Sequence, residues 1–141
     1  MSKILGIIAE YNPFHNGHLY HLEESKRLID PSYTVCVISG NFAQRGIPSV
    51  INKWEKTKIA LESGADLVVE LPTVYSISSA ENFAQGAIKI LESFKATTVL
   101  SFGSECGDIS ILKDISQILT DEPPEYKSLL SHELSARKFI P

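Results

Sequence analysis

The fold is decided by the stretch Ile4-Leu5-Gly6-Ile7-Ile8-Ala9-Glu10-Tyr11-Asn12-Pro13-Phe14-His15-Asn16-Gly17-His18-Leu19. Its first six residues are apolar throughout, which is typical of a strand buried on both faces of a parallel sheet. A turn-rich segment follows, and an amphipathic helix is expected to begin next. Open α/β sheets bind ligands where their strands end, and helix N-termini offer free N–H groups to anions. The stretch therefore predicts an anion site that includes His15 and His18.

Apolar runs and amphipathic stretches alternate along the rest of the chain. We expect strands over 3–9, 33–39, 66–71 and 97–102, and helices over 16–29, 53–63, 80–94, 108–119 and 125–137. Strands that alternate with helices of this length indicate βαβ units with right-handed crossovers. The predicted fold class is therefore α/β, a Rossmann-like parallel sheet with flanking helices. The prolines near 123 suggest a boundary, with domains over 1–120 and 121–141.

Composition narrows the function classes. The chain has 141 residues, 43% hydrophobic and 21% charged, with a net charge of −4. This balance fits a globular domain and argues against a general nucleic-acid binder with a large basic surface. No apolar stretch could span a bilayer and no signal peptide is recognisable, so we expect a cytoplasmic protein. Cys36 and Cys106 lack metal or redox spacing, and we interpret them as a buried inert thiol and a free exposed one.

Polar residues gather in the loops that should meet at the carboxyl edge of the sheet. His15 and His18 can donate hydrogen bonds to phosphate oxygens, and Gly17 allows close backbone approach. The loop after the second strand adds three candidate substrate contacts, and the next helix opens on a fourth: Asn41, Gln44, Arg45 and Lys53. The alternative for the three loop residues is a solvated turn, and the alternative for Lys53 is a lysine side chain in solvent. His21 is interpreted as a supporting residue, and Gly103 as a place where a nucleoside approaches the backbone.

Two further groups of side chains are open to two interpretations each. Glu10 and Glu70 lie near strand ends, where a carboxylate either holds Mg²⁺ or caps a helix. The aromatic residues Trp54, Tyr75 and Phe83 either line the pocket or pack in the core, and core packing is the interpretation we favour.

The ordered motifs resemble a known family. His15-x-Gly17-His18 resembles the HxGH signature of the nucleotidylyl transferase superfamily. A larger set is similar to the bacterial tRNA(Met) cytidine acetate ligase family: Glu10 to Leu19, Ser39 to Gly46, Lys53-Trp54, Ala65 to Pro72, Ser79-Ala80-Glu81 and Phe102 to Glu105. These motifs come in the family's order and cover most of the chain.

The resemblance implies a function. Such ligases convert ATP and acetate to acetyl-adenylate and pyrophosphate, then acetylate the wobble cytidine of elongator tRNA(Met). His15 and His18 would be catalytic, and residues 1–120 an ATP-binding, nucleotidyltransferase-like domain. The implied ATP-binding residues are Ile8, Ala9, Glu10, Tyr11, Asn12, Pro13, Phe14, His15, Asn16, Gly17, His18, Leu19, Tyr20, His21 and Gly103. We expect Mg²⁺ with ATP, assign no metal ligand, and expect a homodimer with no membrane partner.

The resemblance stops before the family's C-terminal features. Family chains are longer and carry further nucleotide contacts and a helical tRNA-binding region, so we interpret the chain, ending at Pro141, as the family's N-terminal part. Two alternatives stay open. One is a small-molecule nucleotidylyltransferase, which the His15-x-Gly17-His18 loop alone would support. The other is a non-catalytic nucleotide-binding fragment.

Overall fold

A four-stranded, wholly parallel sheet forms the centre of the first of two compact units in the computed structural model, which describes residues 2–136. Its strands are β1 (Ile4–Ala9), β2 (Tyr33–Ser39), β3 (Leu67–Leu71) and β4 (Val99–Ser101), in the spatial order β3-β2-β1-β4. The connecting helices are α1 (Asn16–Ile29), α2 (Lys53–Glu62), α3 (Thr73–Ser76) and α4 (Ala80–Ser93). The predicted α/β fold with a Rossmann-like parallel sheet is confirmed.

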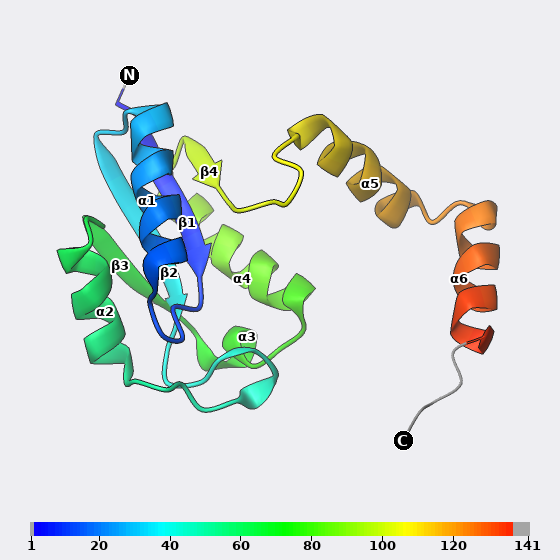
Figure 1. Ribbon diagram of the computed structural model, residues 1–141, viewed down its shortest axis with the longest axis horizontal. Coiled ribbons are helices and arrows are strands. Elements are labelled where there is room, and N and C mark those ends of the chain that lie inside the picture. Colours follow the sequence, from blue (N-terminus) through cyan, green and yellow to red (C-terminus); the bar gives the residue numbers. More distant parts are fainter. Residues whose placement is uncertain (1, 137–141) are drawn as a thin grey trace. The chain divides into compact units, whose positions relative to one another are not determined.

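Two hydrophobic clusters cover the two faces of the sheet, because successive strand residues point to opposite sides. Leu5, Ile7 and Cys36 pack with Leu22 of α1 and Ala60 of α2. On the other face, residues of β2 and β3 pack with three buried residues of α4: Phe83, Ala87 and Leu91. Figure 1 shows α1 and α2 on one side of the sheet and α4 on the other.

The helix ends follow local chemistry. α2 begins where the Asn52 side chain accepts hydrogen bonds from the N–H groups of Trp54 and Glu55, at 2.9 and 3.0 Å. α1 ends at Asp30, which adopts a left-handed conformation (φ 48°) directly before Pro31. These stop and start signals are why α1 ends and α2 begins at the predicted residues.

Two elements differ from the sequence prediction. β4 is shorter than 97–102 because the side chain of Thr98 replaces part of the ladder, and its Oγ1 accepts a hydrogen bond from the Ile4 N–H at 3.0 Å. The segment after Pro72, expected to be a loop, contains the single-turn helix α3, stabilised by a bond from Ser76 Oγ to the Leu71 carbonyl at 3.1 Å. One turn is too short to produce a detectable hydrophobic period.

The second unit begins at Ser104 and contains α5 (Ile109–Asp121) and α6 (Pro124–Ala136). Asp108 caps α5 by accepting from the Ser110 N–H at 2.8 Å. The predicted C-terminal helix is confirmed as far as Ala136, whereas Arg137, its last predicted residue, lies outside the described residues. The domain boundary near 120 stays a prediction. Within 2–136, no helix is both long and apolar enough to cross a membrane.

Candidate nucleotide site

His15 is the N-cap of α1, and its imidazole takes the place of the usual small polar side chain. The Nδ1 atom accepts a hydrogen bond from the Gly17 N–H at 3.1 Å. A Cβ at position 17 would lie 3.0 Å from Cε1 of the His15 ring. Glycine two residues after His15 therefore leaves room for the ring to fold over the first turn. The cap leaves Nδ1 without a proton, so the neutral ring carries its proton on Nε2.

His18 completes a reciprocal cap from the third helical position. Its Nδ1 accepts from the His15 N–H at 3.3 Å, and the two rings stack with centroids 3.7 Å apart. Partial burial, then the proximity of His15 and His21, lowers the pKa of His18. Near neutral pH the His18 ring is therefore uncharged and has an Nε2–H. Both imidazoles use one nitrogen to build the helix start and keep the other as a hydrogen-bond donor.

Two aromatic residues of the preceding loop hold His18 in place. The Tyr11 ring lies edge-on to His18 with centroids 4.9 Å apart, and Phe14 lies 5.6 Å from it. Tyr11 is buried, and its hydroxyl lies 3.7 Å from Sγ of Cys36. Burial first, then the neighbouring Cys36, raises the pKa of Tyr11, so the phenol stays protonated. The loop between β1 and α1 is anchored in the core, which fixes the orientation of His18.

A cavity of about 390 Å³ runs from the first turn of α1 to the end of β4. Nε2 of His21 lies 3.0 Å from Oγ of Ser101, which is 2.7 Å from Oγ of Ser25. Burial lowers the pKa of His21, which favours its neutral form. Gly17 and Gly103 also line the cavity, and a Cβ on Gly103 would meet nothing within 4 Å. His21 thus contacts Ser101 in the wall next to the histidine pair, and its supporting role stays a prediction.

Lys56 joins three loop segments behind the histidine loop. Its side chain is completely buried, and Nζ donates to the Glu10 carbonyl (3.0 Å), Ser39 Oγ (3.0 Å) and Ser49 Oγ (3.2 Å). Burial lowers the pKa of Lys56, although the carboxylates of Glu10 and Glu70 oppose that shift. All three ammonium protons have acceptors in the chain, so Lys56 positions the loops rather than contacting a ligand.

The predicted substrate loop lies against the histidine loop through backbone caps. Glu10 Oε1 accepts from the Gln44 N–H at 2.7 Å, and Asn12 Oδ1 accepts from the Val50 N–H at 2.7 Å. Arg45 is exposed in a left-handed conformation (φ 64°), and within residues 2–136 its guanidinium makes no ion pair. The structure therefore brings Gln44 to Glu10, while Arg45 extends into solvent.

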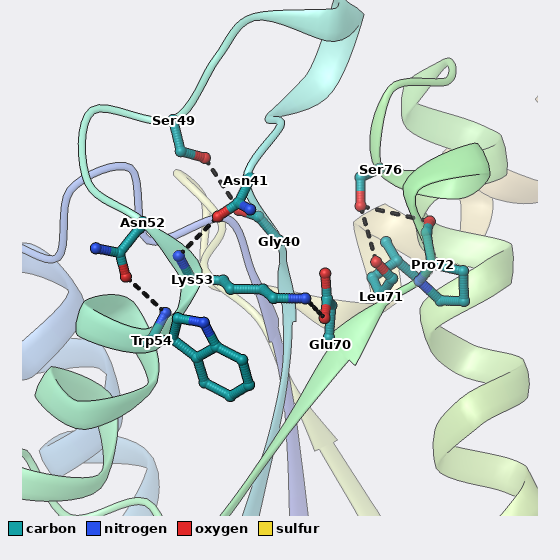
Figure 2. A network of polar contacts seen from close by, with 10 residues as sticks. All are labelled: Gly40, Asn41, Ser49, Asn52, Lys53, Trp54, Glu70, Leu71, Pro72 and Ser76. Atoms are coloured by element: carbon teal, nitrogen blue, oxygen red, sulfur yellow. Dashed lines mark hydrogen bonds and ion pairs between the residues drawn. The ribbon is translucent and has the colours of Figure 1, made fainter.

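The remaining candidates lie at the ends of β2 and β3. Asn41 Oδ1 accepts from the Lys53 N–H at 2.9 Å, and Lys53 Nζ pairs with Glu70 Oε2 at 2.7 Å (Figure 2). Trp54 is 73% exposed, so the expectation that it packs in the core is wrong, whereas Phe83 is buried as expected. Trp54 occupies the solvent face of the first turn of α2, whose core face carries Lys56 instead.

Each of the two strand-end carboxylates has a partner within the chain. Glu10 Oε1 accepts from the Gln44 N–H, and Glu70 Oε2 pairs with Lys53 Nζ. Across residues 2–136, His, Cys, Asp and Glu side chains form no group of three suited to a metal. Magnesium bound together with ATP stays a prediction, and such an ion would be held by the phosphate oxygens.

Sequence reasoning missed Lys56, Ser25 and Ser101. The only available signal for Lys56 is its spacing, since it lies four residues before the buried Ala60 and thus on the core face of α2. Ser25 similarly follows Leu22 by three residues on the buried side of α1. A polar residue on an otherwise apolar helix face is the pattern that could have identified both.

Comparison with known families agrees with this geometry. A family model described as HIGH Nucleotidyl Transferase matches residues 2–139. The tRNA(Met) cytidine acetate ligase of Acetivibrio thermocellus is 57% identical over 94% of this chain, and that of Thermoanaerobacter sp. (strain X514) is 56% identical over 94%. This chain covers 32% and 33% of those two proteins, about a third of their length.

Solved structures give the same result. The Thermotoga maritima TmcAL bound with alpha-thio ATP superposes with a TM-score of 0.85 at 48% identity, over 94% of this chain and 32% of that one. The apo form gives a TM-score of 0.86 at 47% identity, over 97% of this chain and 33% of that one. The resemblance and the fold class inferred from the sequence are both confirmed.

Proposed function

This chain belongs to the HIGH nucleotidyl transferase family, and from that premise we propose that it is the ATP-binding part of a ligase that activates acetate and acetylates tRNA. The observation that carries the proposal is the reciprocal histidine cap at the start of α1, where His15 and His18 both keep Nε2–H donors. A triphosphate placed there meets two imidazole donors and the positive end of the helix.

The proposed reaction has two steps. An acetate oxygen attacks the α-phosphorus of ATP, the bond from that phosphorus to the bridging oxygen breaks, and pyrophosphate leaves with acetyl-adenylate formed. The exocyclic amine of the wobble cytidine of elongator tRNA(Met) then attacks the acetyl carbon, the bond from that carbon to the phosphate oxygen breaks, AMP leaves, and the amine nitrogen loses a proton to solvent. His15 and His18 stabilise the negative charge that develops on the phosphate oxygens in the first step.

The cavity between α1 and β4 is the proposed nucleoside side of the site. It adjoins the histidine pair through Gly17 and ends at Gly103, so a triphosphate on the helix start can extend its nucleoside along this wall. The remaining predicted ATP contacts, from Ile8 to His21, surround the same helix start. Acetate would be bound near Asn41, Gln44, Arg45 and Lys53. The homodimer, the tRNA contacts and the cytoplasmic location stay predictions.

ATP–pyrophosphate exchange tests the proposal. We expect this chain to bind ATP in calorimetry, and we expect labelled pyrophosphate to enter ATP only when acetate is present, measured beside a full-length relative. Exchange by this chain would place the whole adenylation site within it. Exchange by the relative alone would make this chain an ATP-binding half-site. Acetate-independent release of pyrophosphate with a phosphorylated acceptor, giving a dinucleotide, would contradict the ligase and favour a small-molecule nucleotidylyltransferase.

A further inference from the structure

A small notch of about 140 Å³ lies at the carboxyl ends of β2 and β3, apart from the cavity beside α1. Its floor is apolar, formed by Ile38 and Val68, and its rim carries Lys53, Glu70 and the indole of Trp54. The notch therefore combines one cation, one anion and one aromatic plane around a space the size of a single planar ring. The proposed function uses Lys53 only as one of four candidate acetate contacts and gives no role to Glu70 or Trp54.

The charged pair at the rim is held in a fixed position. Asn41 accepts from the Lys53 N–H, and Lys53 Nζ donates to Glu70 Oε2 at 2.7 Å. A Cβ at position 40 would collide with the Glu70 carboxylate, so the glycine there leaves room for it. The side chains of Lys53 and Glu70 are 31% and 42% exposed, and such pairs add little stability. Each also keeps spare capacity, because an ammonium has three donors and a carboxylate has about four lone-pair sites.

Trp54 supplies a flat surface beside this pair. Its indole is 73% exposed, and Lys53 Nζ lies over the ring at 5.3 Å from the centroid. In Figure 2 the Lys53 side chain extends past the indole toward the Glu70 carboxylate. Exposed aromatic rings next to cations are the platforms on which single-stranded nucleic acids stack their bases, and each stacked base contributes about 1–3 kcal/mol.

The notch is also close to the histidine loop. Ile38 of β2 pairs with Ala9 of β1 on one side and with Glu70 of β3 on the other. Two strand spacings, about 10 Å, therefore separate Glu70 from the end of β1. Ser39 lines the notch, and its hydroxyl donates to the Glu10 carbonyl at 3.1 Å, where the histidine loop begins. A base in the notch would lie beside the nucleotide site along the same sheet edge.

We propose that this notch binds a cytosine base from a single-stranded segment of RNA. The Glu70 carboxylate accepts from the exocyclic amine, Lys53 donates to the ring's acceptor atoms, and the ring stacks on Trp54. A carboxylate selects cytosine over uracil, because uracil presents an acceptor oxygen where cytosine presents the amine. This inference rests on the proposed function, since it names how the nucleic-acid substrate of that same reaction is recognised.

Fluorescence of Trp54 tests the inference, because it is the only tryptophan in the chain. The probes are the pentaribonucleotides UUCUU and UUUUU, which differ only in the central base. We expect UUCUU to quench the emission with an affinity about 5- to 150-fold higher than UUUUU. Equal quenching by the two RNAs, or no quenching by either, overturns the proposal.

Variants separate base recognition from general binding. Glu70→Gln replaces the carboxylate by an amide that both donates and accepts, so the preference for UUCUU should fall to within about twofold. Glu62→Gln removes an exposed carboxylate from α2 outside the notch and should keep the preference. An unchanged preference in Glu70→Gln contradicts the assignment. ATP binding by the unaltered chain is measured separately, so its failure would count against the proposed function and a missing cytosine preference against the notch.

Discussion

His15 both caps α1 and is proposed to bind the triphosphate, so substitutions at this position can separate the effect on stability from the effect on ligand binding. Its Nδ1 caps α1 through the Gly17 N–H, while Nε2 is the atom proposed to donate to the triphosphate. His15→Ala removes both functions. His15→Asn keeps the cap, because asparagine is among the best N-cap residues, but removes the imidazole donor. Comparing the two variants therefore isolates the ligand contact from the helix start.

The magnitudes follow from the two kinds of hydrogen bond. Loss of an N-cap costs about 1 kcal/mol, so His15→Ala should lower the free energy of unfolding by about that amount while His15→Asn changes it by less than about 0.5 kcal/mol. Loss of one hydrogen bond to a charged phosphate costs about 1.5–3 kcal/mol. Both variants should therefore bind ATP about 10- to 150-fold more weakly than the parent chain.

Urea titration followed by circular dichroism measures the first quantity, and isothermal titration calorimetry with ATP measures the second. His132→Asn is a matched control, because it removes an exposed imidazole of α6 by the same substitution. Parental ATP affinity in His15→Asn would refute the contact between His15 and the triphosphate. Parental stability in His15→Ala would refute the cap.

Three further predictions concern packing, thiols and pH. Gly86→Ala should lower the unfolding free energy by about 1 kcal/mol in urea, because overpacking outweighs the helix propensity gained: a Cβ there would lie 2.5 Å from Cγ of the Tyr75 ring. Ellman's reagent at pH 8 should label one thiol per native chain. Burial raises the pKa of Cys36 to about 11, whereas a hydrogen bond with the Ser104 hydroxyl lowers the pKa of the exposed Cys106. Labelling that persists in Cys106→Ser would contradict this assignment. Burial lowers the pKa of His21, so below about pH 6.5 the unfolded chain binds more protons than the folded chain. The free energy of unfolding should therefore fall as the pH drops from 7.5 to 5.5, and it should fall less in His21→Asn.

The sequence predicted the elements whose signals are local. The apolar run from Ile4 to Ala9 and the caps at Asn52 and Asp108 each occupy adjacent residues, and the structure has the corresponding strand and helix starts there. The position of the histidine pair at the start of α1 was predictable for the same reason. Its capping geometry was not, because nothing local distinguishes an imidazole that accepts from the Gly17 N–H from one that faces solvent.

Local sequence patterns could not predict which side chains meet across the sheet. Lys56 meets the Glu10 carbonyl from 46 positions away in sequence, and Lys53 meets Glu70 from 17 away. The sequence predicted Lys53 only as a candidate substrate contact, whereas in the structure its Nζ donates to the Glu70 carboxylate. Trp54 was assigned to the core by residue type alone, and exposure of so large a ring is determined by the direction of α2 relative to the sheet.

Helix α2 explains why the two proposed binding regions are adjacent. Its buried side directs Lys56 to the Glu10 carbonyl and to Ser39, and its first turn directs Lys53 and Trp54 to the notch. Ser39 accepts from Lys56, donates to Glu10 and lines the notch, so one hydroxyl contacts the supports of both regions. Displacement of α2 would therefore move the notch and the start of the histidine loop together. Under the two proposals above, this shared support would keep the nucleotide and the base in register along one sheet edge, as group transfer between them requires.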